Sequence, residues 1–157
     1  MGGWGTIRRV TSSQSTASPG EDLDPETAAF RERMPFAALL GITHVVASRD
    51  QVQASIAWDP TRCTTVGTLH GGAMMGLADS VGGYLAFLNL PDGAGGTATI
   101  ESKTNFLRPV RNGAVTALAR PLHVGRAVIV VDTELRDEED RLVARVTQTQ
   151  AVLPSRG

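Results

Sequence analysis

The chain has 157 residues, of which 41% are hydrophobic and 20% are charged, and its formal net charge is −1. This length and composition suit one globular domain with a sizeable core and leave no room for a second. The near-neutral charge excludes an overall attraction to nucleic acid or to an anionic membrane. The single cysteine, Cys63, excludes an intrachain disulfide, a thiol-pair redox centre and a Cys-rich zinc site, so we expect a protein of the reducing cytoplasm.

Residues 1–22 are rich in Ser, Thr and Gly, and we expect them to form a disordered leader without a secretory hydrophobic stretch. No apolar run of about 18 residues is free of polar interruption, so no membrane span is expected. A single folded domain is placed at residues 23–154. It is expected to begin with a helix at residues 24–34, which starts with Asp-Pro-Glu-Thr. A short apolar turn at residues 35–41 and strands at 42–48 and 51–58 follow.

The most informative stretch is GTLHGG at residues 67–72, which leads into an apolar helix predicted for residues 71–90. Apolar side chains lie all round this helix, which predicts that it is buried on most sides. The first N–H groups of a helix are unpaired and carry partial positive charge. Gly71 and Gly72 therefore offer oxyanion donors to a thioester carbonyl.

Asp79 lies within this apolar helix, about two turns after Gly71. An ionisable group on a buried helix is costly unless it is paired or employed. One interpretation makes Asp79 a structural carboxylate that caps or hydrogen-bonds a neighbouring segment. We favour the other, in which Asp79 faces the same cleft as the helix end and either acts as general base on water or attacks the acyl carbon itself.

The remainder of the chain is strand-like after a glycine-rich turn at residues 91–96. Strands are predicted at residues 97–107, 114–124, 127–136 and 142–153. Short turns separate the last three strands, which favours antiparallel pairing between them. A long buried helix followed by a meander of long strands predicts an α+β fold in which a curved antiparallel sheet wraps around the helix.

Three motifs occur in order along the chain: GxxHGG at residues 67–72, LAD at 77–79 and NFLRP at 105–109. Each motif is weak alone, but their combination is specific. With them the chain, from about residue 24 to 153, resembles the hotdog-fold acyl-CoA thioesterases, specifically the PaaI-like branch of phenylacetate degradation. The resemblance implies the hotdog fold and the hydrolysis of fatty or aromatic acyl-CoA thioesters to free acid and CoA. No cofactor is implied, because CoA is part of the substrate.

The resemblance also implies catalytic roles. It makes Asp79 the general base or nucleophile and the Gly71 N–H the oxyanion donor. His70 is expected to order the turn and support the site more than to carry a proton, and a neutral imidazole that bridges backbone groups is the structural alternative. Thr64 stands where relatives commonly carry an Asn that holds the water or the thioester, and its hydroxyl is shorter than an amide. Thr99 occupies the position where a human cytosolic relative of this branch carries a serine that orients the nucleophile, with an ordinary strand residue as the alternative.

The CoA moiety is expected at the strand ends, where basic side chains supply positive charge for the nucleotide phosphates. The turn at residues 125–126 is favoured because relatives use that turn beside the pantetheine arm. Glu101 is expected on the same face of its strand as Thr99, by the period-two rule. The predicted substrate-binding residues are Gly72, Lys103, Arg108, Arg111, Gly125 and Arg126.

The three histidines, His44, His70 and His123, lack metal-ligand spacing, so no metal is expected.

One sheet around one helix leaves the edges of the sheet uncovered, and such edges favour pairing with another chain. The resemblance implies a homodimer, often doubled to a homotetramer, in which Asp79 comes from one chain and Gly71 from the other.

Two other functions stay open. A non-catalytic acyl-CoA-binding sensor is favoured weakly by Thr64 and disfavoured by Asp79, and the chain has no DNA-binding segment of adequate size. A hotdog enoyl-CoA hydratase would use an Asp and a His at another spacing. The acyl group is not set by the sequence, although its pocket is expected among Met74, Met75, Val81, Tyr84 and Leu88.

Overall fold

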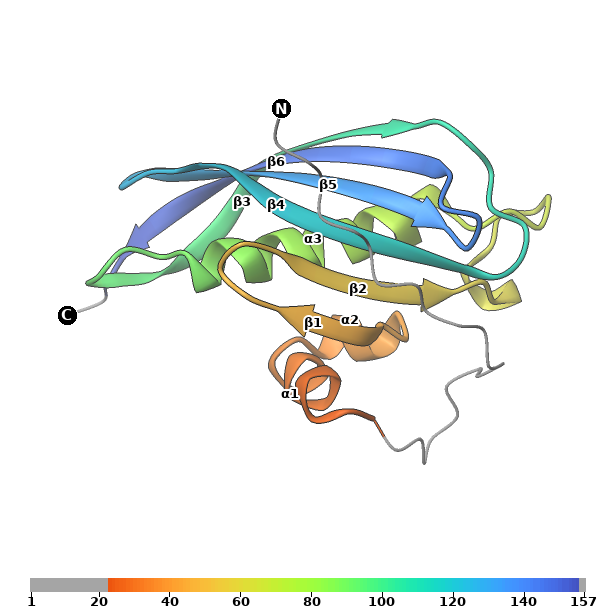
Figure 1. Ribbon diagram of the computed structural model, residues 1–157, viewed down its shortest axis with the longest axis horizontal. Coiled ribbons are helices and arrows are strands. Elements are labelled where there is room, and N and C mark those ends of the chain that lie inside the picture. Colours follow the sequence, from red (N-terminus) through yellow and green to blue (C-terminus); the bar gives the residue numbers. More distant parts are fainter. Residues whose placement is uncertain (1–22, 156–157) are drawn as a thin grey trace.

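The computed structural model describes residues 23–155, so the leader predicted for residues 1–22 lies outside the described residues. Each predicted helix and strand is confirmed, with ends within three residues of the expected ones (Figure 1). The 3-10 helix η1 was not predicted. The elements are α1 (Pro25–Arg33), α2 (Pro35–Leu39), β1 (Thr43–Ala47), β2 (Val52–Ala57), η1 (Pro60–Arg62), α3 (Gly71–Leu88), β3 (Ala94–Phe106), β4 (Ala114–Val124), β5 (Val128–Asp137) and β6 (Leu142–Pro154).

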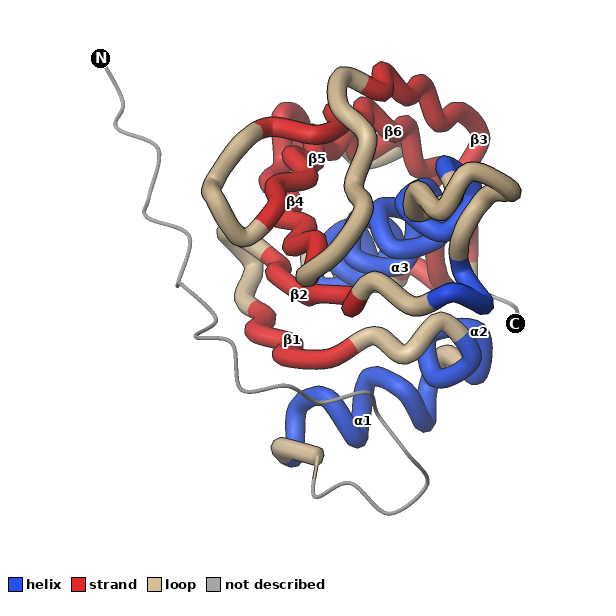
Figure 2. Tube along the Cα trace, turned by 90° about the vertical axis from the view of Figure 1, so that its right-hand side faces the viewer, coloured by secondary structure: helices blue, strands red, loops and turns tan. Residues whose placement is uncertain are grey.

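The strands form one antiparallel sheet in the order β1-β2-β4-β5-β6-β3. The sheet curves around α3, which contacts β2, β3, β4, β5 and β6 (Figures 1 and 2). Helices α1 and α2 lie beyond β1, at the other side of the molecule from β6. The predicted α+β fold, a curved antiparallel sheet wrapped around a long helix, is therefore confirmed. Strand β3 directly follows α3 in the chain but pairs with β6, so it forms an edge of the sheet.

The core lies between α3 and the concave face of the sheet. Leu77, Val81 and Leu85 of α3 are fully buried there, together with Ile56 and Leu135 of the sheet. Each such side chain contributes about 1.5–3 kcal/mol on burial. The prediction that α3 is buried on most sides is confirmed, since half of its residues are buried and most of the others are half-buried. One narrow side remains exposed in the single chain at Met75, Asp79 and Phe87.

A hydrogen-bonded threonine joins α1 to β1. Asp24 is the N-cap of α1 and accepts from the Thr27 N–H at 2.9 Å and from the Thr27 Oγ1 at 2.6 Å. Burial alone would raise the pKa of Asp24, but these bonds from Thr27 outweigh it, so that the pKa lies below its ordinary value. The same Thr27 Oγ1 accepts from the buried N–H of Val45 at 2.9 Å. Thr27 thus fixes where α1 lies against the first strand.

The start of α3 is capped by a histidine. His70 is the N-cap, and its Nδ1 accepts from the Gly72 N–H at 2.8 Å. An accepting Nδ1 means that the neutral ring carries its proton on Nε2. The Gly71 N–H makes no hydrogen bond to any residue of the described part of the chain. A Cβ at Gly71 would lie 2.9 Å from the Cζ of Phe106, so a side chain at this position would force the Phe106 ring to shift.

Replacing Thr27 with valine should lower the free energy of unfolding by about 1–3 kcal/mol, because the buried Val45 N–H loses its acceptor. Urea denaturation measures this change. Thr27→Ser keeps the hydroxyl and is the matched control. Equal stability of the two variants would contradict the bridging role of Thr27.

Replacing His70 with alanine should lower the free energy of unfolding by about 1 kcal/mol, because α3 loses its N-cap acceptor. His70→Asn should restore most of this loss, since asparagine is a good N-cap residue. Thermal or urea unfolding of the three proteins tests this. An alanine variant as stable as the wild type would show that the cap contributes nothing.

Candidate active site

The carboxylate of Asp79 projects from α3 towards β3 and β6. Its Oδ1 accepts from the Thr99 Oγ1 at 3.0 Å and from the Gln148 Nε2 at 2.7 Å. Both donors bind the same oxygen, and Oδ2 accepts no hydrogen bond from residues 23–155. Asp79 is exposed in the single chain, so one of its oxygens is held while the other is free.

Two buried glutamines of β6 support this arrangement, and the sequence analysis missed both. Gln148 is fully buried, and Gln150 is 1% exposed. The Gln150 Nε2 donates to the Thr99 Oγ1 at 2.7 Å. Hydrogen bonds thus run from Gln150 through Thr99 to Asp79, and directly from Gln148 to Asp79. The available signal was two glutamines at alternate positions of a strand whose other inward side chains are apolar.

A β-bulge in β3 aims Thr99 at the helix. Thr99 pairs with Gln150, but Glu101 pairs with Thr149, so Ile100 is an extra residue in the strand. Neighbours along β6 face opposite sides of the sheet, and Glu101 accordingly accepts from the Thr149 Oγ1 at 3.2 Å. The expectation that Glu101 shares the face of Thr99 was wrong, because the bulge breaks the period-two rule.

Thr64 closes the loop that precedes α3. Its Oγ1 lies 2.9 Å from the Thr68 Oγ1, and its N–H donates to the Thr68 carbonyl at 2.8 Å. The Gly67 N–H donates to the Thr64 carbonyl at 3.0 Å. The Thr64 hydroxyl is thus engaged within its own loop in the single chain.

The predicted acid and oxyanion donor do not meet within one chain. Gly71 and Asp79 are eight residues apart on α3, which separates them by about 12 Å along the helix axis. A nucleophilic carboxylate and an oxyanion donor each act within about 3 Å of the same reacting group. Within one chain these two groups therefore lie apart along α3.

The predicted CoA-binding cations are also spread over the molecule. The Arg108 Nη1 donates to the Leu142 carbonyl at 2.7 Å, and Lys103 hydrogen-bonds the Asn105 side chain. Arg126 is exposed on the β4–β5 turn, where the adjacent Gly125 N–H donates to the Val128 carbonyl. Strand pairing places this turn beside the end of β6 opposite to Leu142. Arg108 and Arg126 thus lie at opposite ends of the sheet.

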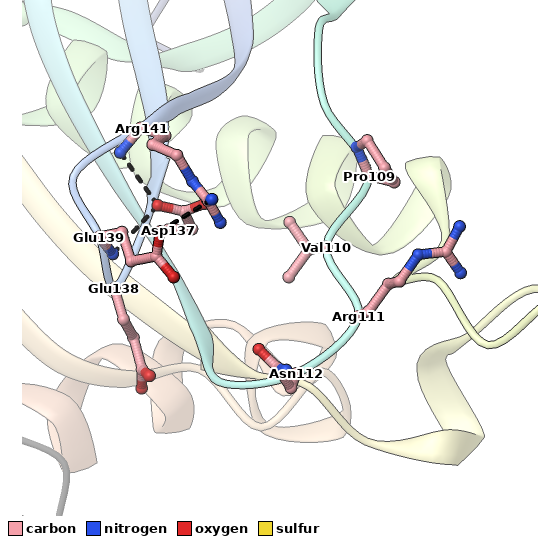
Figure 3. A pocket seen from close by; sticks show the side chains of 8 residues that line it. All are labelled: Pro109, Val110, Arg111, Asn112, Asp137, Glu138, Glu139 and Arg141. Atoms are coloured by element: carbon pink, nitrogen blue, oxygen red, sulfur yellow. Dashed lines mark hydrogen bonds and ion pairs between the residues drawn. The ribbon is translucent and has the colours of Figure 1, made fainter.

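Arg111 lines a depression between the β3–β4 loop and the β5–β6 turn (Figure 3). Its side chain points away from the acidic residues there, and its Nη1 donates to the Val66 carbonyl at 3.3 Å. Burial would raise the pKa of Asp137, but hydrogen bonds from Arg141 outweigh it and lower that pKa. Arg141 also pairs with Glu139 at 2.8 Å. Asp79, Thr99 and Gln148 do not line this depression, so we do not assign catalysis to it.

Two further observations concern residues 23–155 only. No three side chains among His, Cys, Asp and Glu are grouped there so that they could hold a metal ion. None of the helices in this part of the chain has the length and apolar character needed to cross a membrane.

Comparison with known proteins identifies the family. Residues 66–144 match the Thioesterase superfamily. The chain is 33% identical over 104 residues to the 1,4-dihydroxy-2-naphthoyl-CoA hydrolase of Escherichia coli, which covers 66% of this chain and 76% of that protein. It superposes on a thioesterase of Haemophilus influenzae with a TM-score of 0.73 at 31% identity, over 78% of this chain and 85% of the other.

The PaaI protein of the Escherichia coli phenylacetic acid degradation operon gives a TM-score of 0.73 at 21% identity, over 83% of this chain and 92% of that protein. At this identity the likeness concerns the fold. The sheet order, the enclosed helix and these matches agree with the resemblance expected from the three motifs. The chain therefore belongs to the thioesterase superfamily and has its hotdog fold.

Proposed function

We propose that this protein hydrolyses acyl-CoA thioesters to a free acid and CoA, with Asp79 as the reacting carboxylate. Membership of the superfamily supports thioester hydrolysis, and the relative from Escherichia coli is named as a hydrolase of a CoA thioester. The observation that carries the proposal is the carboxylate of Asp79, which is exposed, held at Oδ1 and free at Oδ2.

Either of two chemical routes suits a carboxylate held in this way. As general base, Asp79 takes a proton from water while the water oxygen bonds to the acyl carbon and the carbon–sulfur bond breaks. As nucleophile, its oxygen bonds to the acyl carbon and expels the CoA thiolate, and water then cleaves the resulting anhydride. In both routes the thiolate leaves as CoA after protonation. The unpaired N–H of Gly71 supplies the hydrogen bond that stabilises the developing oxyanion.

A homodimer would complete this site. The separation of about 12 Å along the helix axis between Gly71 and Asp79 favours a site in which one of them comes from a second copy. Strand β3 is an edge strand with unpaired backbone groups, and it exposes Ile100 and Phe106. Pairing of two such edges would bring Asp79 of one protomer near Gly71 of the other. Doubling of this dimer to a homotetramer stays an expectation.

The acyl group is proposed to be apolar. Met75 lies one turn before Asp79 on the open side of α3 and is 38% exposed. Of the residues expected around the acyl group, Met74 and Val81 are buried in the single chain. Lys103, Arg108, Arg111 and the turn at residues 125–126 remain proposed contacts of CoA, with Gly72 at the start of α3.

Wild-type protein should release free thiol from at least one of a panel of short, medium, long and aromatic acyl-CoAs. Asp79→Ala and Asp79→Asn should each lower kcat by about 10²- to 10⁴-fold, because both remove the general base or nucleophile. Thiol release is followed with a chromogenic disulfide reagent. The asparagine variant controls for shape, since it keeps an acceptor for Thr99 and Gln148. Tight binding of acyl-CoA without turnover by the wild type would instead favour the sensor, with Thr64 as the residue to examine.

A mixture of two inactive variants should recover activity if the site is shared between chains. Asp79→Ala lacks the acid, and Gly71→Ala adds a methyl group that meets the Phe106 ring. A mixed dimer retains one site with both Gly71 and Asp79 intact. The isolated mixed dimer should show about one half of wild-type activity, because each such dimer has one good site of two.

This complementation is measured after co-expression with two affinity tags and isolation of the mixed species. Each variant alone, purified in the same way, is the control. A mixed species as inactive as its parents would show that Asp79 and Gly71 do not act across an interface.

A further inference from the structure

We propose that Gln148, seated against Gly82 of α3, is a positioning residue for Asp79 that holds its Oδ1 so that Oδ2 faces the thioester. This inference rests on the proposed role of Asp79. It adds a residue that is distant in sequence and was not among the expected site residues.

The amide of Gln148 is buried at a cost that packing alone does not explain. Its side chain is fully buried, and its Oε1 has no hydrogen-bond partner among the described residues. A buried acceptor without a partner destabilises a fold, and an apolar side chain of similar size avoids this penalty. The favourable polar contact of this amide is the 2.7 Å bond from Nε2 to Asp79 Oδ1. The presence of a glutamine at position 148 is therefore better explained by its hydrogen bond to the Asp79 carboxylate than by packing in the core.

Gly82 makes room for this amide. A Cβ at Gly82 would overlap the Oε1 of Gln148, and glycine inside a helix lowers helix stability relative to alanine. The next residue, Gly83, differs in this respect, because a Cβ there would meet no atom within 4 Å. Both glycines lie in α3 and have the same low helix propensity, but of the two only Gly82 contacts Gln148.

The hydrogen bonds fix the rotation of the carboxylate. Gln148 and Thr99 donate to the same oxygen, and Gln150 donates to Thr99, which orients the hydroxyl towards Asp79. A carboxylate held at one oxygen presents the other in a constant direction. Such preorganisation raises the fraction of encounters in which water or the acyl carbon is in reach. The effect falls on kcat more than on substrate binding.

The test compares Gln148→Leu and Gly82→Ala with two matched controls. Gly83→Ala makes the same change one residue along α3. Gln53→Leu removes a 5% exposed glutamine from β2, which β4 and β5 separate from β6. Kinetics on the best acyl-CoA of the wild type and thermal unfolding are measured for each protein.

Gln148→Leu should lower kcat by about 10- to 100-fold with KM changed less than twofold, while its Tm equals or exceeds that of the wild type. Gly82→Ala should lower kcat in the same direction, because the methyl group displaces the amide. Gly83→Ala and Gln53→Leu should keep the wild-type kcat. The inference is overturned by an unchanged kcat in Gln148→Leu, by a kcat that falls only together with Tm, or by equal losses in Gly82→Ala and Gly83→Ala.

A second measurement separates this inference from the proposed function. If the wild type hydrolyses no acyl-CoA, the proposed function fails, and the side-chain amide signals of Gln148 in a nitrogen-15 NMR spectrum still report its contact. Asp79→Ala should shift these signals more than those of Gln53. Signals of Gln148 that do not respond to the loss of Asp79 would overturn the positioning role whatever the activity.

Discussion

The structure depends on one constraint: α3 must bury its apolar face in the curved sheet and still leave one side open for a carboxylate. The sheet meets this constraint by ending at β3, beside the side of α3 that carries Asp79. A sheet that enclosed the helix completely would bury Asp79 and keep water away from its carboxylate. The edge at β3 thus leaves this carboxylate accessible without removing the core that holds the helix.

The edge strand β3 also leaves two features of a single chain without a partner. The backbone groups of β3 on its outer side lack a strand partner, and the oxyanion donor on α3 lies two turns from the acid. The proposed homodimer would remedy both deficits, because an isologous interface supplies each missing group twice. Assembly and chemistry are then linked, and the proposed active unit is no smaller than two chains.

Local patterns along the chain were sufficient for the strands and the longer helices and drew attention to Asp79, because helix caps, periodicity and turns are encoded within a few residues. The place of β3 beside β6 was not predicted, since pairing between distant strands leaves no local signal. Glu101 was assigned to the wrong face because one extra residue, Ile100, reverses the alternation. Gln148 was missed for a related reason: it meets Asp79 across 69 residues of sequence, and only the sheet order brings them together.

Several features around Asp79 depart from ordinary folding rules. They support a functional role for this carboxylate independently of the comparison with relatives. An interior helix glycine at position 82, a buried acceptor without a partner on Gln148, and a bulge after Thr99 each reduce stability or regularity. Each one also brings a hydrogen-bond donor to the carboxylate or makes room for it. Sequences violate local rules mainly where function requires it. Departures at three positions that serve one oxygen atom are better explained by the chemistry of that carboxylate than by the packing of the core.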